Sequence, residues 1–481
     1  MSGVQRQSRF EQSDDVVVMK FGGTSVEDES AIRRLISIVQ SRRGSQPVLV
    51  VSALSKVTDQ LLEAGEAAAK GHLGLAVAIV RDIYVRHEQL ADILVEGPAY
   101  GPLDRELRVE FQSLEALLHD LEISRELNPR LQDLLLGFGE TVSSKLVSEA
   151  LNHAGTTAVC VDARNCIVTD ARHGQANPLW NLTEERVQET LGPLLEQGSV
   201  PVLGGFIAST QEGVPTTLGR GGSDFSASIL AAALGASRVE IWTDVDGVMT
   251  TDPRLCPEAR VIRKMSFDEA AELAHYGAKV LHPATVAPAM RKNIPVYVLN
   301  SRRPEANGTE ITARARTGKT VSAITAKRNV AAVDIKSHHA IDSALLDAVF
   351  NAFDRHSCSV DVMATSLGRI SLLAGSAAAL PKISAELQAL AQVNWENHKA
   401  LVCIVGENIR RQPEVASQAF AAVSDMDVRV LCQGASDRTI SFLVQDRDVE
   451  ESVQRLHNVF FPKAESGRDW GGISAAYCQA G

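Results

Sequence analysis

A glycine-rich stretch carries the residues whose types and spacing point most directly to chemistry. Residues 218–224 read LGRGGSD and lead into an apolar, helix-forming segment that begins at Phe225. Three glycines within four positions let the backbone adopt positive φ and approach a ligand closely. The free N–H groups at the start of the following helix favour an anion, and an arginine between glycines is suited to binding a carboxylate or phosphate through two hydrogen bonds. The stretch indicates an anion-binding loop, and the alternative is a structural turn whose serine or aspartate caps the helix.

A second glycine turn follows the first apolar run of the chain. Residues 20–25 read KFGGTS, between the β-branched run 16–21 and a helical stretch at 30–39. Here the backbone N–H groups of Gly22 and Gly23 are candidates for contact with phosphate oxygens, and Lys20 supplies a cation beside them. A solvated lysine at a strand end is the alternative for Lys20. No Walker A loop and no GxGxxG follow this strand, which excludes the P-loop and Rossmann interpretations.

Short β-branched or apolar runs alternate with helical stretches over the first 300 residues, which predicts a mostly parallel α/β sheet with helices on both faces. Ligands of such sheets bind beyond the carboxyl ends of the strands. Small and polar residues fall at these ends: Gly22-Gly23, Ser52, Gly204-Gly205 and Thr243-Asp244. The runs expected to form strands are 16–21, 47–52, 157–161, 200–207, 238–243 and 294–299, and the main helical stretches are 30–39, 130–154, 184–196 and 268–274.

The pattern changes after a polar, turn-rich segment at 304–320, which we expect to be a linker. Five residues of the following region recur 70 positions later: Phe350, Val360, Ser366, Ile370 and Ser371 match Phe420, Val430, Ser436, Ile440 and Ser441. Each copy is predicted to form a helix, a strand, a turn and a strand, followed by another helix. This predicts two small α+β units whose sheets pair with one another, within the chain or across a dimer.

Composition limits the kinds of partner. The net charge of −11 argues against nucleic acid, although a local basic cluster can still bind a small anion. No apolar run is long enough to cross a membrane, and the polar first 15 residues do not form a signal peptide. The seven scattered cysteines indicate neither a disulfide framework nor a zinc site. We therefore expect a cytoplasmic protein of two or three domains, with a disordered tail at 1–14 and a loose tail at 462–481.

Six motifs together resemble the aspartate kinase family, in the order in which that family carries them. The resemblance covers about residues 15–461 and is closest to the monofunctional, lysine-sensitive type, because no segment is left over for a fused dehydrogenase. The repeat after residue 320 is similar to the tandem ACT domains by which this family is regulated. The motifs are KFGGTSV at 20–26, LVVSALSKVTDQLL at 49–62, GFGE at 137–140, LGRGGSD at 218–224, WTDVDGVMTTDPR at 242–254 and YGAKVLHP at 276–283.

This resemblance implies an amino-acid-kinase fold over 15–303 and two ferredoxin-like ACT domains at 321–400 and 401–461, the first with a strand shared with the second. It implies phosphorylation of the side-chain carboxylate of L-aspartate by ATP to 4-phospho-L-aspartate, the first step of lysine, threonine and methionine synthesis. Mg²⁺ is expected to arrive on the nucleotide phosphates, since no metal-ligand spacing is recognisable in the sequence. A homodimer or higher homo-oligomer and an amino-acid effector at the ACT domains are also implied.

For the reaction itself, the resemblance assigns roles to Lys20 and Asp224. Lys20 would offset the repulsion between the carboxylate and the terminal phosphoryl group, which is roughly 4 kcal/mol per pair of unit charges at about 4 Å and an effective dielectric near 20. Asp224 would orient Lys20 or the substrate ammonium group, because an ionised carboxylate needs no general base.

For the amino acid, Arg220 would bind the α-carboxylate and Glu140 the ammonium group, while Ser52, Thr58 and Ser223 would add contacts. Helix capping is the alternative for Ser52, Thr58 and Asp224, and a helix-start glutamate without function is the alternative for Glu140.

For ATP, the matched residues cluster around the first and fifth strands and the YGAKVLHP motif. Where the family often has tyrosine near the adenosine, this chain has Met249, whose thioether can pack on a purine. Lys279 would meet phosphate charge. We expect His282 to be structural and His338-His339 to lie in a solvated loop. The implied ATP-binding residues are Lys20, Phe21, Gly22, Gly23, Thr243, Asp244, Met249, Arg254, Lys279 and Val280.

Two other functions remain as alternatives. One is another amino-acid kinase, acting on N-acetylglutamate, glutamate or UMP, against which stand the long helical insert at 64–136 and the ACT pair. The other is a non-catalytic amino-acid sensor, against which stands the presence of every charged motif residue.

The regulatory region departs from the family pattern. Lysine-responsive members resemble one another in a Gly-Phe-Leu start of the first ACT helix and a Ser-Glu pair after the next strand. This chain has Ala344-Leu345-Leu346 and Ser366-Leu367 there. Leu367 offers no carboxylate to an effector's ammonium group, and Asp361 and Asp342 are the candidate replacements. We expect lysine feedback to be weak, altered in specificity or absent.

Overall fold

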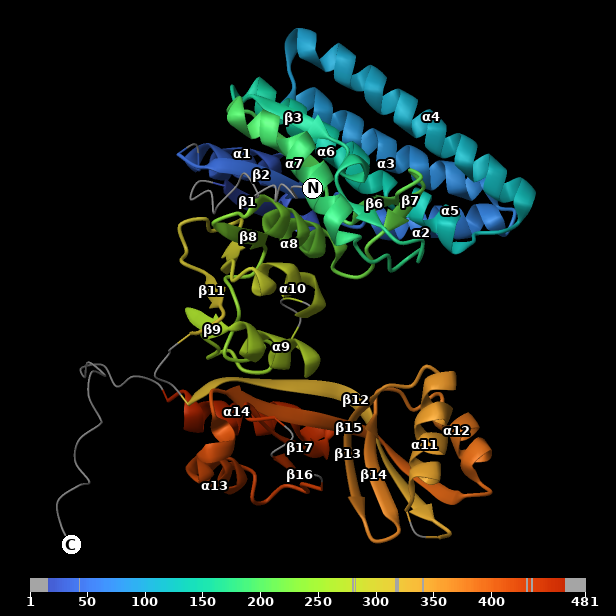
Figure 1. The fold of residues 1–481 in the computed structure, drawn as a ribbon, viewed down its shortest axis with the longest axis vertical. Helices are drawn as coiled ribbons and strands as arrows, with labels where there is room; N and C mark the ends of the chain where they lie inside the picture. The colour runs from blue at the N-terminus through green and yellow to red at the C-terminus, as the bar shows by residue number, and fades with distance from the viewer. Residues whose placement is uncertain are drawn as a thin grey trace, which may run out of the picture. The chain divides into compact units, whose positions relative to one another are not determined.

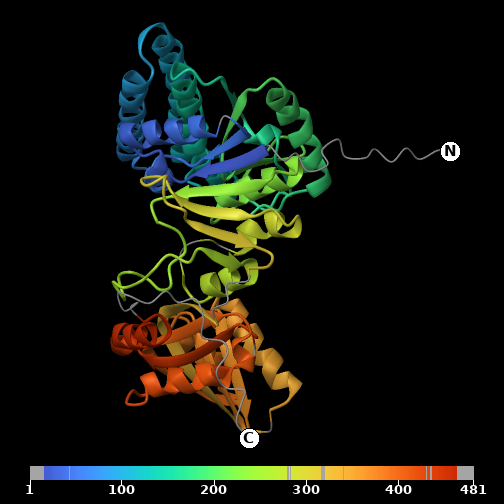
Figure 2. The ribbon, with the colours of Figure 1, turned by 90° about the vertical axis from the view of Figure 1, so that its left-hand side faces the viewer.

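The computed structural model describes residues 16–42, 44–278, 281, 283–315, 320–339, 341–429, 431–433 and 436–462. Its contacts divide the chain into two compact units, which are drawn from two directions (Figure 1, Figure 2). The first unit runs to Val248 and includes Val261–His275 and Lys279–Thr317. The second consists of Met249–Arg260, Tyr276–Ala278 and the chain from Gly318 onward. The tails expected at 1–14 and 462–481 lie outside the described residues, apart from Pro462.

An eight-stranded sheet forms the centre of the first unit. Its neighbouring strands are all parallel except for one antiparallel pair near an edge, and the predicted mostly parallel sheet is confirmed. The central strand β1 (Val16–Phe21) is buried on both faces, and for this reason its sequence is a continuous apolar run interrupted only by Lys20. In spatial order the strands are β3 (Ala158–Val161), β5 (Val200–Gly204), β2 (Gln46–Val51), β1 (Val16–Phe21), β8 (Arg238–Thr243), β10 (Val296–Asn300), β11 (Thr309–Thr312) and β9 (Lys264–Ser266).

The run 200–207, expected to be one strand, is broken after Gly204. The chain turns at Phe206, which has a φ of 68°, and then leaves the main sheet. It continues as β6 (Ile207–Thr210) in a separate three-stranded sheet, with β4 (Val168–Thr169) and β7 (Pro215–Thr217). A strand prediction from composition could not detect this break, because Ile207 continues the apolar pattern.

The segment 304–320, expected to be a linker, contributes strand β11 to the main sheet. Val298 pairs with Thr309 and Val296 with Ile311 in the antiparallel contact between β10 and β11. The polar composition of the segment hid this strand, because only Thr309 and Ile311 of the four residues of β11 are buried.

Helices cover both faces of the main sheet (Figure 1). One face carries α1 (Glu29–Ser41) and α6 (Phe138–His153), and the other carries α7 (Trp180–Glu196), α8 (Gly222–Leu234) and α10 (Pro283–Arg291). The predicted helix at 130–154 is interrupted at Gly137. An additional helical layer covers α6, and it consists of α2 (Val57–Ala69), α3 (Leu73–Leu94), α4 (Tyr100–Ser124) and α5 (Pro129–Leu136). Helix α9 (Phe267–His275) follows β9. Within the residues described, no helix combines the length and apolar character needed to span a bilayer.

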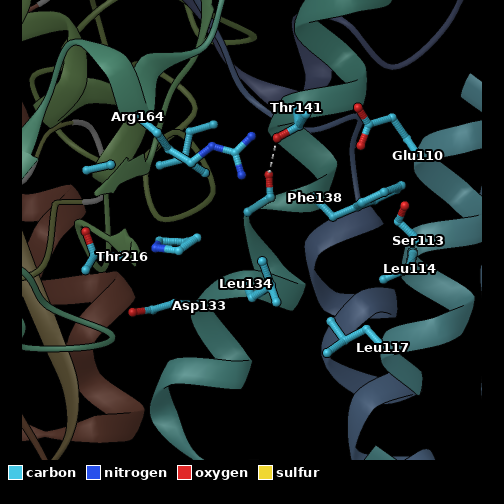
Figure 3. Close-up of a pocket in the computed structure, with 14 residues that line it drawn as sticks. Glu110, Ser113, Leu114, Leu117, Asp133, Leu134, Phe138, Thr141, Arg164 and Thr216 are labelled. Atoms are coloured by element: carbon cyan, nitrogen blue, oxygen red, sulfur yellow. Dashed lines mark hydrogen bonds between the residues drawn. The ribbon is translucent and has the colours of Figure 1, made fainter. Parts of the chain in front are cut away.

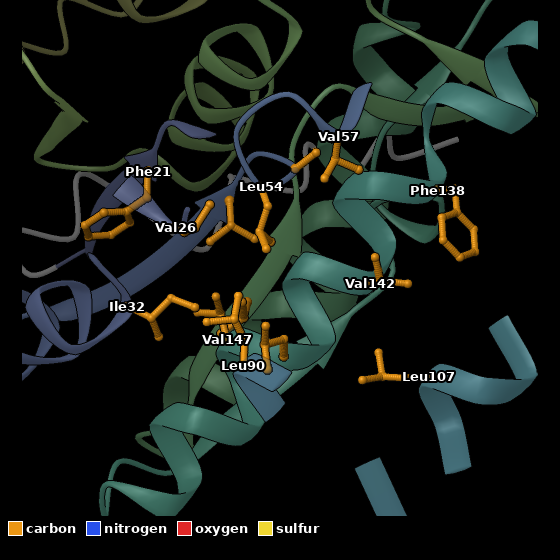
Figure 4. Packing of buried hydrophobic residues seen from close by; sticks show 14 of the residues in the cluster. Phe21, Val26, Ile32, Leu54, Val57, Leu90, Leu107, Phe138, Val142 and Val147 are labelled. Atoms are coloured by element: carbon orange, nitrogen blue, oxygen red, sulfur yellow. The ribbon is translucent and has the colours of Figure 1, made fainter. Parts of the chain in front are cut away.

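The helical layer and the sheet share one apolar core (Figure 4). Phe111 of α4 meets Phe138 of α6 edge to face, with ring centroids 4.9 Å apart. The cluster continues through Val142 on α6 to Phe21 on β1. This continuous packing fixes the start of α6 against the sheet. Buried residues recur every three or four positions along α4, as one face of a helix requires: Leu103, Leu107, Phe111, Leu114, Leu118 and Leu121.

The second unit is built on a six-stranded antiparallel sheet that runs through both sequence repeats. In spatial order its strands are β13 (Val360–Ser366), β14 (Arg369–Ala374), β12 (Val321–Ser337), β15 (Ala391–Gly406), β17 (Thr439–Gln445) and β16 (Leu431–Gln433). The long strands β12 and β15 belong to both halves. The first half carries α11 (Ser343–Arg355) and α12 (Leu380–Leu387), and the second carries α13 (Pro413–Ala422) and α14 (Val449–Phe460). The predicted α+β repeat is confirmed, although Val430 of the matched pairs lies outside the described residues.

Residues 249–260 are part of the second unit although they precede it in the sequence. The Oγ1 atom of Thr250 lies 2.9 Å from Nε2 of His457 on α14. Arg260 donates a hydrogen bond to the carbonyl of Pro462, and Cys256 is buried in the apolar cluster beneath α13 and α14. The second half of the WTDVDGVMTTDPR motif is thus held by the second ACT-type repeat.

Candidate active site

A cavity of about 300 Å³ lies beyond the carboxyl ends of β1, β2 and β5. The structure brings together here every residue that the sequence assigned to the reaction or to the amino acid. Phe206 and three glycines complete the wall. The lining residues are Lys20, Ser52, Thr58, Glu140, Phe206, Gly219, Arg220, Gly221, Gly222, Ser223 and Asp224.

Lys20 and Asp224 form an ion pair at the centre of this cavity. Lys20 is the only residue of β1 that is not buried, and its Nζ lies 2.7 Å from Oδ1 of Asp224. The two side chains are only 12% and 15% exposed, so water screens the pair less than it would at the surface. Asp224 lies in the first turn of α8, where the helix dipole favours a negative charge. The pair connects the central strand to α8 and holds the ammonium group in a defined position.

The glycine-rich loop presents Arg220 without burying it. Gly219 and Gly221 have φ angles of 76° and 72°, which a residue with a side chain rarely adopts. Arg220 lies between them, exposed at the cavity wall. The N-cap of α8 is Gly221, and no side chain caps the helix, so the capping interpretation of Asp224 is wrong.

The hydroxyl groups on the wall are also not helix caps. Ser52 Oγ donates a hydrogen bond to Oγ of Ser223 at 3.0 Å, which joins the end of β2 to the start of α8. Thr58 lies within the first turn of α2, whose N-cap position is Lys56. The capping alternatives for Ser52 and Thr58 are therefore wrong.

Glu140 is a buried carboxylate with one open oxygen. It lies in the first turn of α6 and is 4% exposed. Its carboxylate accepts hydrogen bonds from the backbone N–H groups of Ala53 and of Glu140 itself. Its Oε2 atom has no hydrogen-bond partner among the described residues. Burial raises the pKa of Glu140 to about 7, because the charged form loses solvation. A buried, unpaired carboxylate oxygen beside a cavity is suited to receiving a cationic group of a ligand.

The glycine pair at the end of β5 allows α6 and α8 to approach one point. A Cβ on Gly204 would lie 2.9 Å from the carbonyl oxygen of Glu140, and a Cβ on Gly205 would lie 2.6 Å from Cβ of Ser223. Both distances are shorter than real Cβ contacts. Only glycine permits the starts of the two helices, and hence Glu140 and Asp224, to meet at the cavity.

Phe206 is a wall residue that the sequence analysis missed. Its φ of 68° is unusual for an aromatic residue, and its backbone N–H donates to Oγ of Ser226 on α8 at 2.9 Å. A Cβ on Gly222 would approach the Cα of Phe206 to 3.0 Å. The only signal in the sequence was the preceding pair Gly204-Gly205, which indicates close packing of two segments but does not identify the segments.

The residues assigned to ATP near β1 pack closely against neighbouring segments. The N–H of Gly22 donates to the carbonyl of Trp242 at 3.1 Å. The Phe21 ring is fully buried and stacks on Trp242 with centroids 6.0 Å apart, which keeps this side chain in the core. Gly23 packs closely, since a Cβ there would lie 3.0 Å from the carbonyl of Ala53.

The remaining ATP candidates fall on different parts of the chain. Thr243 and Asp244 follow β8, and the Thr243 hydroxyl donates to the Asp244 carboxylate at 3.2 Å. Met249 and Arg254 belong to the second unit, where Arg254 forms an exposed pair with Asp252 at 2.6 Å. Lys279, Val280 and His282 lie outside the described residues.

Gly205→Ala tests the close approach at the end of β5. The backbone of Gly205 is not left-handed, so the new methyl group meets only the packing of Ser223. We expect the free energy of unfolding to fall by about 1–3 kcal/mol, the usual cost of overpacking. Urea denaturation measures this change. Gly74→Ala is the control, because no heavy atom lies within 4 Å of a Cβ there, and equal midpoints for the two variants would contradict the prediction.

Comparisons with known proteins agree with this geometry. The Amino acid kinase family matches residues 15–300, and an ACT domain matches residues 402–460. Lysine-sensitive aspartokinase 3 of Escherichia coli is 36% identical over 93% of this chain and 99% of that protein, and chloroplastic aspartokinase 3 of Arabidopsis thaliana is 34% identical over 92% and 81%. The crystal structure of E. coli aspartokinase III with aspartate and ADP has a TM-score of 0.80 at 34% identity, covering 93% of this chain and 100% of that one. The chain therefore belongs to the aspartokinase family.

Proposed function

We propose that the cavity at Lys20 binds L-aspartate and that the γ-phosphoryl group of ATP is transferred there to its side-chain carboxylate. One observation carries this proposal: the wall offers a group of opposite charge for each of the three charged groups of aspartate, and its fourth charged residue, Asp224, pairs with Lys20. The open oxygen of Glu140 suits the ammonium group, Arg220 the α-carboxylate, and Lys20 the reacting carboxylate. The E. coli structure with aspartate and ADP supports the same assignment by similarity.

The reaction needs no proton transfer. An oxygen of the ionised side-chain carboxylate attacks the γ-phosphorus, a new O–P bond forms, and the bond to the bridging oxygen breaks so that ADP leaves with its electron pair. The barrier lies in bringing two anions together, and the cation of Lys20 lowers it most where charge shifts in the transition state. Asp224 holds Lys20 in place and acts as a positioning residue.

For the nucleotide, we propose contacts from a set of ten residues, of which Lys20 is shared between the substrates. The other nine are Phe21, Gly22, Gly23, Thr243, Asp244, Met249, Arg254, Lys279 and Val280. Among the described residues, no group of three or more His, Cys, Asp or Glu side chains is arranged to hold a metal ion. We propose that Mg²⁺ binds through the phosphates of ATP and its own waters. When bound, the ion neutralises charge on the β- and γ-phosphate oxygens.

A homodimer through the first ACT-type repeat is also proposed. Strand β13 is an edge of the six-stranded sheet, and apolar side chains gather on this half of the unit without cover. Phe350 is 46% exposed, Met363 37%, and Leu367 completely exposed. An edge strand flanked by exposed apolar residues is a usual site of pairing with a second copy. We also propose a cytoplasmic location, because the seven scattered cysteines show no pattern of a disulfide framework.

The regulatory carboxylates expected to receive an effector are already occupied. Nζ of Lys327 on β12 lies 2.7 Å from both carboxylate oxygens of Asp361, whose side chain is 5% exposed. Asp342 accepts the N–H of Leu345 and caps α11. We propose that an ammonium group of this chain takes the place that an effector's ammonium group would need, and that lysine feedback is weak for this reason.

Lys20→Ala tests the catalytic assignment. We expect kcat for ADP release with aspartate to fall by about 10²–10³, the scale of losing one preorganised electrostatic contact. A coupled ADP assay measures it, and circular dichroism checks the fold. Lys70→Ala is the control, since Lys70 forms only an exposed pair with Glu66. Wild-type turnover of Lys20→Ala, or preference of the native enzyme for N-acetylglutamate, glutamate or UMP, would refute the proposal.

The raised pKa of Glu140 predicts a pH-dependent affinity for aspartate. With a pKa of about 7, roughly a tenth of Glu140 is ionised at pH 6 and roughly nine tenths at pH 8. Only the ionised form attracts the ammonium group, so we expect KM for aspartate to fall about tenfold between these pH values. Aspartate itself keeps its charges over this interval. In Glu140→Gln the KM should be higher and nearly independent of pH, and a wild-type KM that stays constant from pH 6 to 8 would be evidence against this role.

L-lysine is expected to inhibit only well above low-micromolar concentrations. Lys327→Ala leaves the buried Asp361 carboxylate without its ammonium partner, so free L-lysine should stabilise this variant against thermal unfolding more than it stabilises the native protein. Lys336→Ala, on the exposed face of the same strand, is the control. Inhibition of the native enzyme by low-micromolar lysine, or an identical thermal response of both variants, would show that Lys327 does not occupy an effector position.

A further inference from the structure

A second cavity, of about 160 Å³, lies on the other side of the start of α6 (Figure 3). Its walls come from α4, α5 and the first turn of α6, together with Arg164 and strands β6 and β7. The floor is apolar and includes Leu114, Leu117, Leu134 and Phe138. The aspartokinase reaction proposed above does not use this cavity.

Three side chains of charged types line this cavity: Glu110 and Arg164 at its rim, and Asp133, which is buried and accepts hydrogen bonds from Gly174 and Thr217. Glu110 comes from α4 and Arg164 from the opposite wall, as Figure 3 shows. Each is already balanced by a neighbour outside the rim: Glu110 lies 3.1 Å from Nζ of Lys145, and Arg164 lies 2.7 Å from Asp162. The hydrogen bonds that Arg164 donates to Asp162 raise the pKa of Arg164. Neither rim group is left without a partner that would have to be supplied by a bound ion.

These features define a class of ligand. An apolar cavity of about 150 Å³ is large enough to hold benzene, so the floor accommodates a leucine or phenylalanine side chain. A rim with one carboxylate and one guanidinium matches the ammonium and carboxylate groups of an amino acid. A hydrocarbon would form no hydrogen bonds with Glu110 and Arg164, and an anion without a cationic group would be repelled by the Glu110 carboxylate.

The cavity adjoins the catalytic cavity at three segments of the chain: the first turn of α6, the end of β5 with the start of β6, and β7 with the glycine-rich loop. Phe138 and Thr141 face it from the same helical turn that carries Glu140. Ile207 follows Phe206, and Thr216 precedes the loop that carries Arg220. A ligand that restrains Phe138 and Thr141 also restrains the turn that presents Glu140 to aspartate.

We propose that this cavity binds an L-α-amino acid with an apolar side chain and that its binding strengthens the binding of aspartate. Glu110 holds the ammonium group, Arg164 holds the carboxylate, and the apolar floor holds the side chain. The coupling arises through the first turn of α6, because a ligand that contacts Phe138 and Thr141 favours the position of Glu140 that binds aspartate. The coupling part rests on the proposed function of the first cavity, whereas the binding part does not.

Isothermal titration calorimetry of the full chain with L-leucine and L-phenylalanine tests binding without turnover. We expect both to bind, and we expect 3-methylbutylamine and 4-methylpentanoate, which each lack one charged group, to bind at least about tenfold more weakly. Arg164→Gln and Glu110→Gln should each weaken L-leucine about tenfold, and Arg172→Gln, whose exposed side chain lies outside the cavity, should not. Absence of binding, or equal affinity for the amine and the amino acid, would overturn the assignment even if aspartate is phosphorylated.

Steady-state kinetics tests the coupling. Saturating L-leucine should lower KM for aspartate about threefold in the native enzyme while kcat stays constant, and this effect should disappear in Arg164→Gln, whose kcat without leucine stays at the native value. A purely structural role of Arg164 would not produce a leucine-dependent change in KM. If leucine binds but KM stays constant or rises, the proposed coupling is wrong. If the enzyme does not phosphorylate aspartate at all, calorimetry still decides whether the cavity binds amino acids.

Discussion

The ion pair between Lys20 and Asp224 is the contact on which the proposed site depends. A lysine ammonium group is a mobile point charge on a flexible stem, so it can stabilise a transition state only if another group fixes its position. Asp224 does so from the first turn of α8, at 2.7 Å and largely shielded from water. The pair carries no net charge, and attraction for an anionic substrate then comes from Arg220. Above its pKa of about 7, Glu140 is ionised and supplies the negative charge that suits the ammonium group of aspartate.

The pair exists because three segments meet with almost no intervening side chains. β1 supplies Lys20, α8 supplies Asp224, and the end of β5 passes between the starts of α6 and α8. Gly204 and Gly205 leave space for Glu140 and Ser223, and Gly222 leaves space for the strained Phe206. The glycines at 219 and 221 serve a different purpose, because they give the loop the positive φ angles that present Arg220 to the cavity.

The sequence allowed the parallel sheet, the ACT-type repeat and the residues that line the cavity at Lys20 to be predicted, for identifiable physical reasons. Alternating apolar runs and helices determine the sheet, and its carboxyl edge must then collect the residues that follow the strands. Contacts between distant segments could not be predicted in this way. The carbonyl of Trp242, more than 200 positions along the chain, accepts the N–H of Gly22. Strand β11 forms because β10 offers it an antiparallel edge, although its own composition is that of a linker.

The WTDVDGVMTTDPR motif is a second case in which contacts between distant segments could not be predicted from the sequence. The sequence presents it as one nucleotide motif, yet Thr243 and Asp244 follow β8, whereas Met249 and Arg254 pack within the second unit. Burial holds the pKa of His457 below its usual value, so its neutral ring shares a hydrogen bond with Thr250. Cys256 and Arg260 attach the same segment to the cluster around α14 and to the carbonyl of Pro462. The position of Met249 and Arg254 is thus set by packing within the regulatory repeat, and a ligand that displaces α14 would displace Thr250 with it.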